Sequence, residues 1–145
     1  MSDTFHPDFI NRYTPLFSAE EFSEFLKFCK LPLRKAIRIN TFKISEADFL
    51  KRAEINKWIL EKIPYVSGWY FINRENTSIP LWKSIEYFAG LFYIQETSSM
   101  IPPMLLIEEP LNSTVLDVSA APGSKTTQIA NYKKWQGLII WNDII

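Results

Sequence analysis

The chain has 145 residues, the length of one domain or of two small units that share a surface. Its composition, 47% hydrophobic and 15% aromatic, excludes a disordered chain, and its net charge of zero gives no sign of a nucleic-acid partner. A single cysteine excludes an intramolecular disulfide and a multi-cysteine zinc cluster. No signal-peptide pattern and no apolar run of roughly 20 residues is present, so we expect a soluble cytoplasmic protein without a membrane partner.

The first part of the chain is predicted to combine helices with short strands. Ser18 begins a capping box, Ser-Ala-Glu-Glu, and the helix after it should end just before Pro32. Ser45 is the expected N-cap of a second helix. Strands are expected at residues 36–40, 58–66 and 68–72, with Ser67 and Gly68 turning between the last two. These elements predict an α+β amino-terminal domain over residues 1–80, and its RNA-binding kind is implied only by the family resemblance given below.

Residues 81–145 are predicted to form a linker helix followed by a first βαβ unit. Thr97 or Ser98 is the expected cap of the linker helix, with Pro102 and Pro103 tolerated in or near its first turn. The βαβ unit is expected as a strand, a helix and a parallel strand at residues 114–118, 124–132 and 138–142. Because a parallel sheet needs more strands, we expect a nucleotide-binding domain that is truncated here, with an unpaired edge available for self-association.

The loop between the expected strand and helix is the main candidate site. A Walker-type ATP site would need glycines where Ser119 and Ser124 stand, and a dinucleotide fingerprint needs three glycines where Gly123 is alone. A nucleoside cofactor without a pyrophosphate remains, with Gly123 allowing close backbone approach and Pro122 stiffening the turn. Asp143, about 20 residues further on at a strand end, is then expected to bind ribose hydroxyls. A chance strand-turn-helix is the alternative.

Residues 115–130, "VLDVSAAPGSKTTQIA", resemble motif I of the RNA cytosine-5 methyltransferases of the Sun family, and most closely the branch of ribosomal RNA small subunit methyltransferase F. The likeness continues upstream in "PLRKAIRINTFKIS" and "GLFYIQETSSMIP", and covers about residues 32–143. It implies a Rossmann-like domain that binds S-adenosylmethionine and methylates carbon-5 of a cytosine in RNA, with small-subunit rRNA as the expected partner. The resemblance assigns cofactor binding to Ala120, Ala121, Pro122, Gly123, Ser124, Lys125, Thr126 and Asp143.

The sequence departs from the family pattern in two ways. The close branch tends to carry Glu where this chain has Asp143, although either acid can accept two hydroxyl groups. The catalytic cysteines of the family lie in later motifs that these 145 residues do not contain. We therefore expect no catalytic residue here and no activity from this chain alone. A non-catalytic RNA-binding or vestigial fragment is the rival interpretation, and an ATP-dependent enzyme is a third.

Other chemically interesting residues have plainer interpretations. Arg34, Lys35 and Arg38 are candidate RNA-phosphate contacts, although a solvated face paired with the acids of the preceding helix fits equally well. Cys29 shares a helical stripe with Phe25 and is predicted to be a core residue. We interpret His6 as a bystander in a frayed segment, and we expect Asp117 to hydrogen-bond the turn or the cofactor rather than to take part in the chemistry. No metal ligands are predicted.

Overall fold

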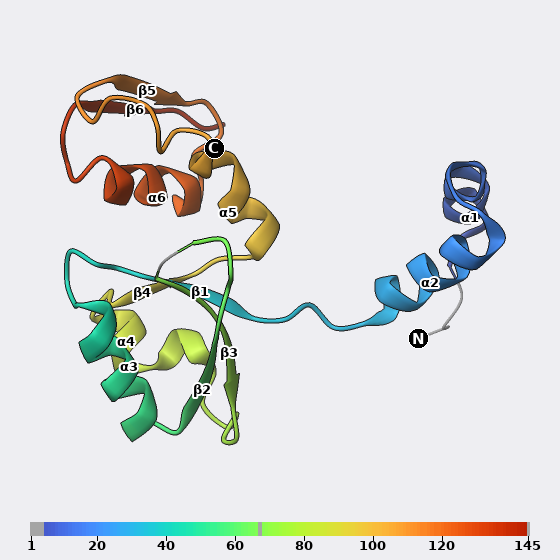
Figure 1. Ribbon diagram of the computed structural model, residues 1–145, viewed down its shortest axis with the longest axis horizontal. Helices are drawn as coiled ribbons and strands as arrows, with labels where there is room; N and C mark the ends of the chain where they lie inside the picture. Colours follow the sequence, from blue (N-terminus) through green and yellow to red (C-terminus); the bar gives the residue numbers. More distant parts are fainter. Residues whose placement is uncertain (1–4, 67, 145) are drawn as a thin grey trace. The chain divides into compact units, whose positions relative to one another are not determined.

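The computed structural model describes residues 5–66 and 68–144, which divide into two units at the boundary between Leu33 and Arg34 (Figure 1). Ser67, expected in a turn, lies outside the described residues. The first unit is helical over the residues described, and the second mixes helices with strands. Within the described ranges, no helix combines the length and the apolar character needed to cross a bilayer.

The first unit contains α1 (Pro7–Tyr13), η1 (Thr14–Leu16) and α2 (Ala19–Lys30). His6 is the N-cap of α1, because its Nδ1 accepts a hydrogen bond of 3.3 Å from the Asp8 N–H. His6 therefore begins a helix rather than lying in a frayed segment, and its interpretation as a bystander to the chemistry stays a prediction. The predicted capping box at Ser18 is confirmed: its hydroxyl accepts from the Glu21 N–H, and the Glu21 carboxylate accepts from the Ser18 N–H.

Cys29 is exposed, so its prediction as a core residue is wrong. The helix α2 packs through aromatic rings in its first half. Phe25 stacks on Phe9 and Phe17, with ring centroids 6.0 and 5.0 Å apart, and Phe22 stacks on Phe17 at 6.3 Å. Cys29 lies in the last turn, one turn beyond these rings. A helical stripe predicts which side chains share a face, but not how far the covering element reaches.

The second unit is organised around an antiparallel sheet of strand order β2-β3-β1-β4. Its strands are β1 (Ala36–Ile39), β2 (Trp58–Lys62), β3 (Trp69–Arg74) and β4 (Phe92–Ile94). The central strand β1 pairs with both neighbours, since Ile37 lies opposite Tyr70 on β3 and Ile94 on β4. Because β4 follows residue 80, the sheet extends past the expected domain boundary, and the division into residues 1–80 and 81–145 stays a prediction.

Helices cover both faces of this sheet (Figure 1). Alternate β1 residues Ile37 and Ile39 pack against Phe49 of α3 (Glu46–Ile55), beside η2 (Leu81–Lys83) and α4 (Ile85–Phe88). On the opposite face, Ala36 packs near Met100 of α5 (Thr97–Met104). The apolar-polar alternation of residues 36–40 predicted a half-exposed strand, but all four residues of β1 are buried because both faces are covered.

The helix α5 begins and ends differently from the sequence prediction. Glu96, rather than Thr97 or Ser98, caps it, because its carboxylate accepts from the N–H groups of Ser98 and Ser99. A glutamate reaches these donors from the N-cap position, although the usual caps are shorter. Pro102 and Pro103 lie near the carboxyl end of this eight-residue helix rather than in its first turn.

A parallel βαβ unit follows, as predicted. It consists of β5 (Thr114–Asp117), α6 (Ser124–Tyr132) and β6 (Leu138–Trp141). Gly137 allows β6 to begin beside β5, since its φ is +76° and a Cβ there would lie 2.4 Å from the Ser113 carbonyl oxygen. Apolar side chains on both strands are exposed, with Leu116 at 58% and Trp141 at 69%. Self-association through this ribbon stays a prediction.

Candidate cofactor site

The loop from β5 to α6 places its single glycine at the start of the helix. Gly123 is the N-cap of α6 with φ of +99°, a left-handed conformation that residues with a Cβ rarely adopt. Its N–H donates to the Ala120 carbonyl at 2.6 Å, and its own carbonyl accepts from the Thr127 N–H at 2.9 Å. No atom lies within 4 Å of where a Cβ would be, so the side of the loop at Gly123 is open.

The end of β6 holds this loop from the other side. The Asp143 carboxylate accepts a hydrogen bond of 2.6 Å from the Ala121 N–H, and the Asn142 carbonyl accepts one of 3.0 Å from the Ala120 N–H. The expected proximity of Asp143 to the glycine loop is therefore present. Because parallel strands carry their carboxyl ends to the same edge, two segments about 20 residues apart meet there.

Asp117 organises the interior of the loop. Its Oδ2 accepts from the Thr126 hydroxyl at 2.6 Å, and its Oδ1 accepts from the Ser119 N–H at 3.3 Å. These bonds tie the end of β5 to the first turn of α6. They confirm the prediction that Asp117 hydrogen-bonds the loop.

These segments enclose a hollow of about 400 Å³. Its lining comprises Ala120, Ala121, Pro122, Gly123, Thr126, Thr127, Trp141 and Asp143. Of the predicted cofactor residues, Ser124 and Lys125 lie in the first turn of α6 but do not line the hollow. Thr127 and Trp141 line it without having been predicted from the sequence. The position of Trp141, two residues before Asp143 at a strand end, was the available signal.

Residues of the large sheet support the hollow from behind. The Tyr93 hydroxyl of β4 donates to the Pro122 carbonyl at 3.1 Å, and the Arg38 guanidinium of β1 donates to the Thr127 hydroxyl at 2.8 Å. Arg38 is only 5% exposed, and this burial lowers its pKa to about 10. The positioning of the loop between β5 and α6 therefore depends on side chains that are distant in sequence.

The three predicted RNA-contact residues have different surroundings. Arg38 is buried and bonded internally, whereas Arg34 and Lys35 are exposed. Arg34 pairs with Glu61 of β2 and lies over the Phe71 ring, 3.7 Å from its centroid. Hydrogen bonding to Arg34 lowers the pKa of the exposed Glu61 carboxyl. Contact with RNA phosphate stays a prediction for these residues.

Comparisons with known proteins match this architecture. Residues 5–97 match the family described as the N-terminal domain of 16S rRNA methyltransferase RsmF. The chain is 45% identical over 121 residues to the ribosomal RNA small subunit methyltransferase F of Vibrio parahaemolyticus, and 40% identical over 146 residues to that of Aeromonas hydrophila. These alignments cover 83% and 97% of this chain but 25% and 31% of the relatives, so the chain spans between a quarter and a third of their length.

Solved structures show the same fold. A methyltransferase homologue from Pyrococcus horikoshii superposes with a TM-score of 0.72 at 28% identity, over 94% of this chain and 48% of that one. The structure of NSun6 from the same organism with SFG gives a TM-score of 0.82 at 20% identity, over 97% and 59% of the two chains. The resemblance noted in the sequence is thus confirmed, and the chain belongs to the family of the N-terminal domain of 16S rRNA methyltransferase RsmF.

Proposed function

We propose that this chain is the S-adenosylmethionine-binding portion of an RNA methyltransferase that acts on carbon-5 of a cytosine in small-subunit rRNA. The observation that carries the proposal is the meeting of the Asp143 carboxylate and the one-glycine loop around a single hollow. In this proposal, β5, α6 and β6 are the beginning of a Rossmann-like domain. The names of the relatives, and the crystal structure of NSun6 with SFG, support the same ligand class.

The residues present fit the cofactor. A hollow of about 400 Å³ lies within the usual size range of small-molecule sites, about 300–1,000 Å³. Ala120 and Ala121 are small enough to leave the backbone accessible to a ligand. Asp143 uses Oδ2 to accept from the Ala121 N–H, and a carboxylate has about four acceptor sites, so capacity remains for the two ribose hydroxyls. A cofactor without a pyrophosphate also explains why one glycine suffices.

When bound, S-adenosylmethionine supplies an electrophilic methyl group. The part of this chain in the reaction is to bind and orient it. Asp143 fixes the ribose, the Ala121 N–H holds that carboxylate in place, and the bond from the Thr126 hydroxyl to Asp117 keeps the loop from opening. We assign the role of nucleophile to no residue of this chain, since its single thiol, Cys29, is not among the residues that line the hollow.

RNA is the proposed macromolecular partner. Exposed Lys35 and Arg34 are suited to contact phosphate, which contributes affinity without reading sequence. Arg38 is buried, and its bond to Thr127 ties the sheet to α6.

Nuclear magnetic resonance titration of the chain with S-adenosylmethionine tests the cofactor proposal. At millimolar ligand we expect amide shifts in residues 120–127 and 141–143. Asp143→Asn should weaken binding about ten-fold or more, because a hydrogen bond to a charged group contributes about 1.5–3 kcal/mol. The matched control is Asp48→Asn, since Asp48 is an exposed carboxylate at the start of α3 that accepts from Ser45. Shifts that leave the loop untouched, or binding unaltered in Asp143→Asn, would overturn the proposal.

A further inference from the structure

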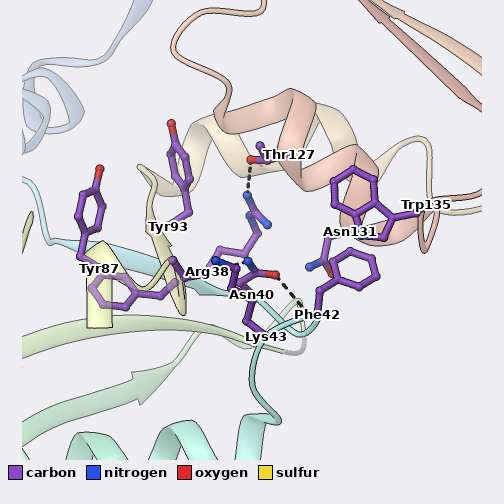
Figure 2. A pocket seen from close by; sticks show the side chains of 11 residues that line it. Arg38, Asn40, Phe42, Lys43, Tyr87, Tyr93, Thr127, Asn131 and Trp135 are labelled. Atoms are coloured by element: carbon purple, nitrogen blue, oxygen red, sulfur yellow. Dashed lines mark hydrogen bonds between the residues drawn. The ribbon is translucent and has the colours of Figure 1, made fainter. Parts of the chain in front are cut away.

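A second hollow, of about 380 Å³, is lined by residues of the sheet strands β1 and β4 and of α6. Figure 2 shows Arg38 extending from β1 toward Thr127, with Tyr93 on one side and Phe42 and Trp135 on the other. Thr127 lines both hollows. A molecule bound in the second hollow would therefore adjoin the cofactor loop.

The charge at the floor of this pocket lacks a carboxylate partner among the described residues. The hydrogen bonds of Arg38 go to neutral acceptors: the Gln95 Oε1 at 3.2 Å, the Thr127 hydroxyl at 2.8 Å and the Ser124 carbonyl at 3.5 Å. Buried charges in proteins are ordinarily paired, because burial without a counter-charge is costly. Lys43 adds an exposed ammonium group at the pocket wall, held by a bond of 2.8 Å to the Ala89 carbonyl. The pocket is therefore suited to an anionic group.

The opposite side of the pocket offers aromatic surface. Phe42 and Trp135 are 43% and 71% exposed, and their ring centroids lie 5.2 Å apart. Trp135 has φ of +60°, in the left-handed region that is unfavourable for a bulky residue and concentrates at functional sites. Asn131, also in the lining, accepts from the Thr41 hydroxyl at 3.0 Å, which orients its amide. The chain thus keeps a large ring in solvent at the mouth of a cationic pocket.

We propose that this pocket binds one nucleotide of a single-stranded RNA, with its base stacked on Phe42 and Trp135 and its phosphate near Arg38 and Lys43. Stacking on aromatic rings combined with cationic groups along the backbone is the general mode of single-strand recognition. The nucleotide lies beside the cofactor hollow rather than in it, so it positions the strand. The inference rests on the proposed function in taking RNA as the partner.

Fluorescence anisotropy of a labelled single-stranded oligoribonucleotide measures this binding. Trp135→Ala should weaken it about ten-fold, because one stacked base is lost. Trp82→Ala is the matched control, since Trp82 is 51% exposed and does not line the pocket. Lys43→Gln should reduce the slope of log affinity against log salt by about 0.7, the value for one phosphate contact on a single strand, whereas exposed Lys62→Gln should not.

Titrations with adenosine 5′-monophosphate and with inorganic phosphate test the aromatic side and the cationic side of the pocket separately. We expect the nucleotide, and not phosphate alone, to shift the indole N–H resonance of Trp135. RNA binding that is equal in Trp135→Ala and Trp82→Ala would overturn the inference, as would a Trp135 signal that the nucleotide leaves unchanged. The titration with S-adenosylmethionine is read at residues 120–126 and 141–143, none of which lines the second hollow, so failure of the nucleotide pocket and failure of the cofactor site are distinguishable.

Discussion

Replacing Gln128 by Leu should destabilise the second unit substantially, because Gln128 joins the sheet, α5 and α6 from a fully buried position. Its amide nitrogen donates to the Met100 carbonyl at 2.8 Å and to the Tyr132 hydroxyl at 2.9 Å. Its Oε1 accepts from Gln95 at 2.7 Å, and Gln95 in turn accepts from Arg38. The hydrogen bonds of Gln128 therefore continue to Arg38, which also bonds Thr127 beside the loop between β5 and α6.

The expected loss follows from the groups left without a partner. Leu has nearly the volume of Gln but neither donates nor accepts, so the buried Met100 carbonyl and one Gln95 N–H lose their bonds to residue 128. Each such buried group costs about 1–3 kcal/mol. We expect the free energy of unfolding to fall by about 3 kcal/mol, from the sum of these costs. At a urea slope of about 2 kcal/mol per molar, the unfolding midpoint should fall by about 1.5 M.

Urea unfolding followed by far-ultraviolet circular dichroism measures this difference. The matched control is Gln136→Leu, because Gln136 is exposed in the turn before β6 and its side chain should contribute little. Equal midpoints for the two variants, with unchanged slopes, would refute the idea that the Gln95–Gln128 pair joins the sheet to the βαβ unit.

Three further outcomes are expected. Gly123→Ala should lower stability by about 1–2 kcal/mol in thermal unfolding, the cost of left-handed backbone, since its Cβ would meet no atom; an unchanged melting temperature would contradict this. Burial raises the pKa of Glu86, but hydrogen bonds, first that from Asn56, lower it to a net value below 4.5. The free energy of unfolding should therefore fall as pH drops below about 4.5. In unfolding curves measured over a pH series, Glu86→Gln should make this acid-side loss of stability less steep. An equally steep loss in the variant would contradict the prediction. Cys29 should react with a thiol reagent about as fast in native buffer as in urea, because it is exposed. A much slower reaction in native buffer would show that Cys29 is buried.

Local signals in the sequence predicted local structure well. The capping box at Ser18 and the N-cap at Ser45 both begin helices where expected, because their hydroxyls satisfy free N–H groups within three residues. The βαβ unit was predictable for the same reason. Gly123 provides the left-handed backbone at the start of α6, and Asp143 follows the second strand and bonds the loop. In each case the information lies within one element or one supersecondary unit.

The burial of Arg38 and the second pocket depend on contacts distant in sequence, whereas the helix caps at His6 and Glu96 were missed although their partners lie within three residues. Arg38 reads as a polar position on a half-exposed strand, but α5 and α6, some sixty to ninety residues later, cover that face and bury it. Trp135 and Phe42 form a pair across more than ninety residues, so nothing local indicated the second pocket. Cys29 was predicted to be buried but is exposed, because a helical stripe does not show how far along the helix the packing partners extend.

Cross-linking tests the cofactor assignment most directly. The chain is irradiated with methyl-labelled S-adenosylmethionine, digested, and the labelled peptides are identified, with excess unlabelled cofactor as competitor. We expect competed label in peptides that span residues 120–127 or 141–143, and about ten-fold less of it in Asp143→Ala. Label that is competed but maps away from these two segments, or that is retained in full by Asp143→Ala, would contradict the assignment of the hollow to S-adenosylmethionine.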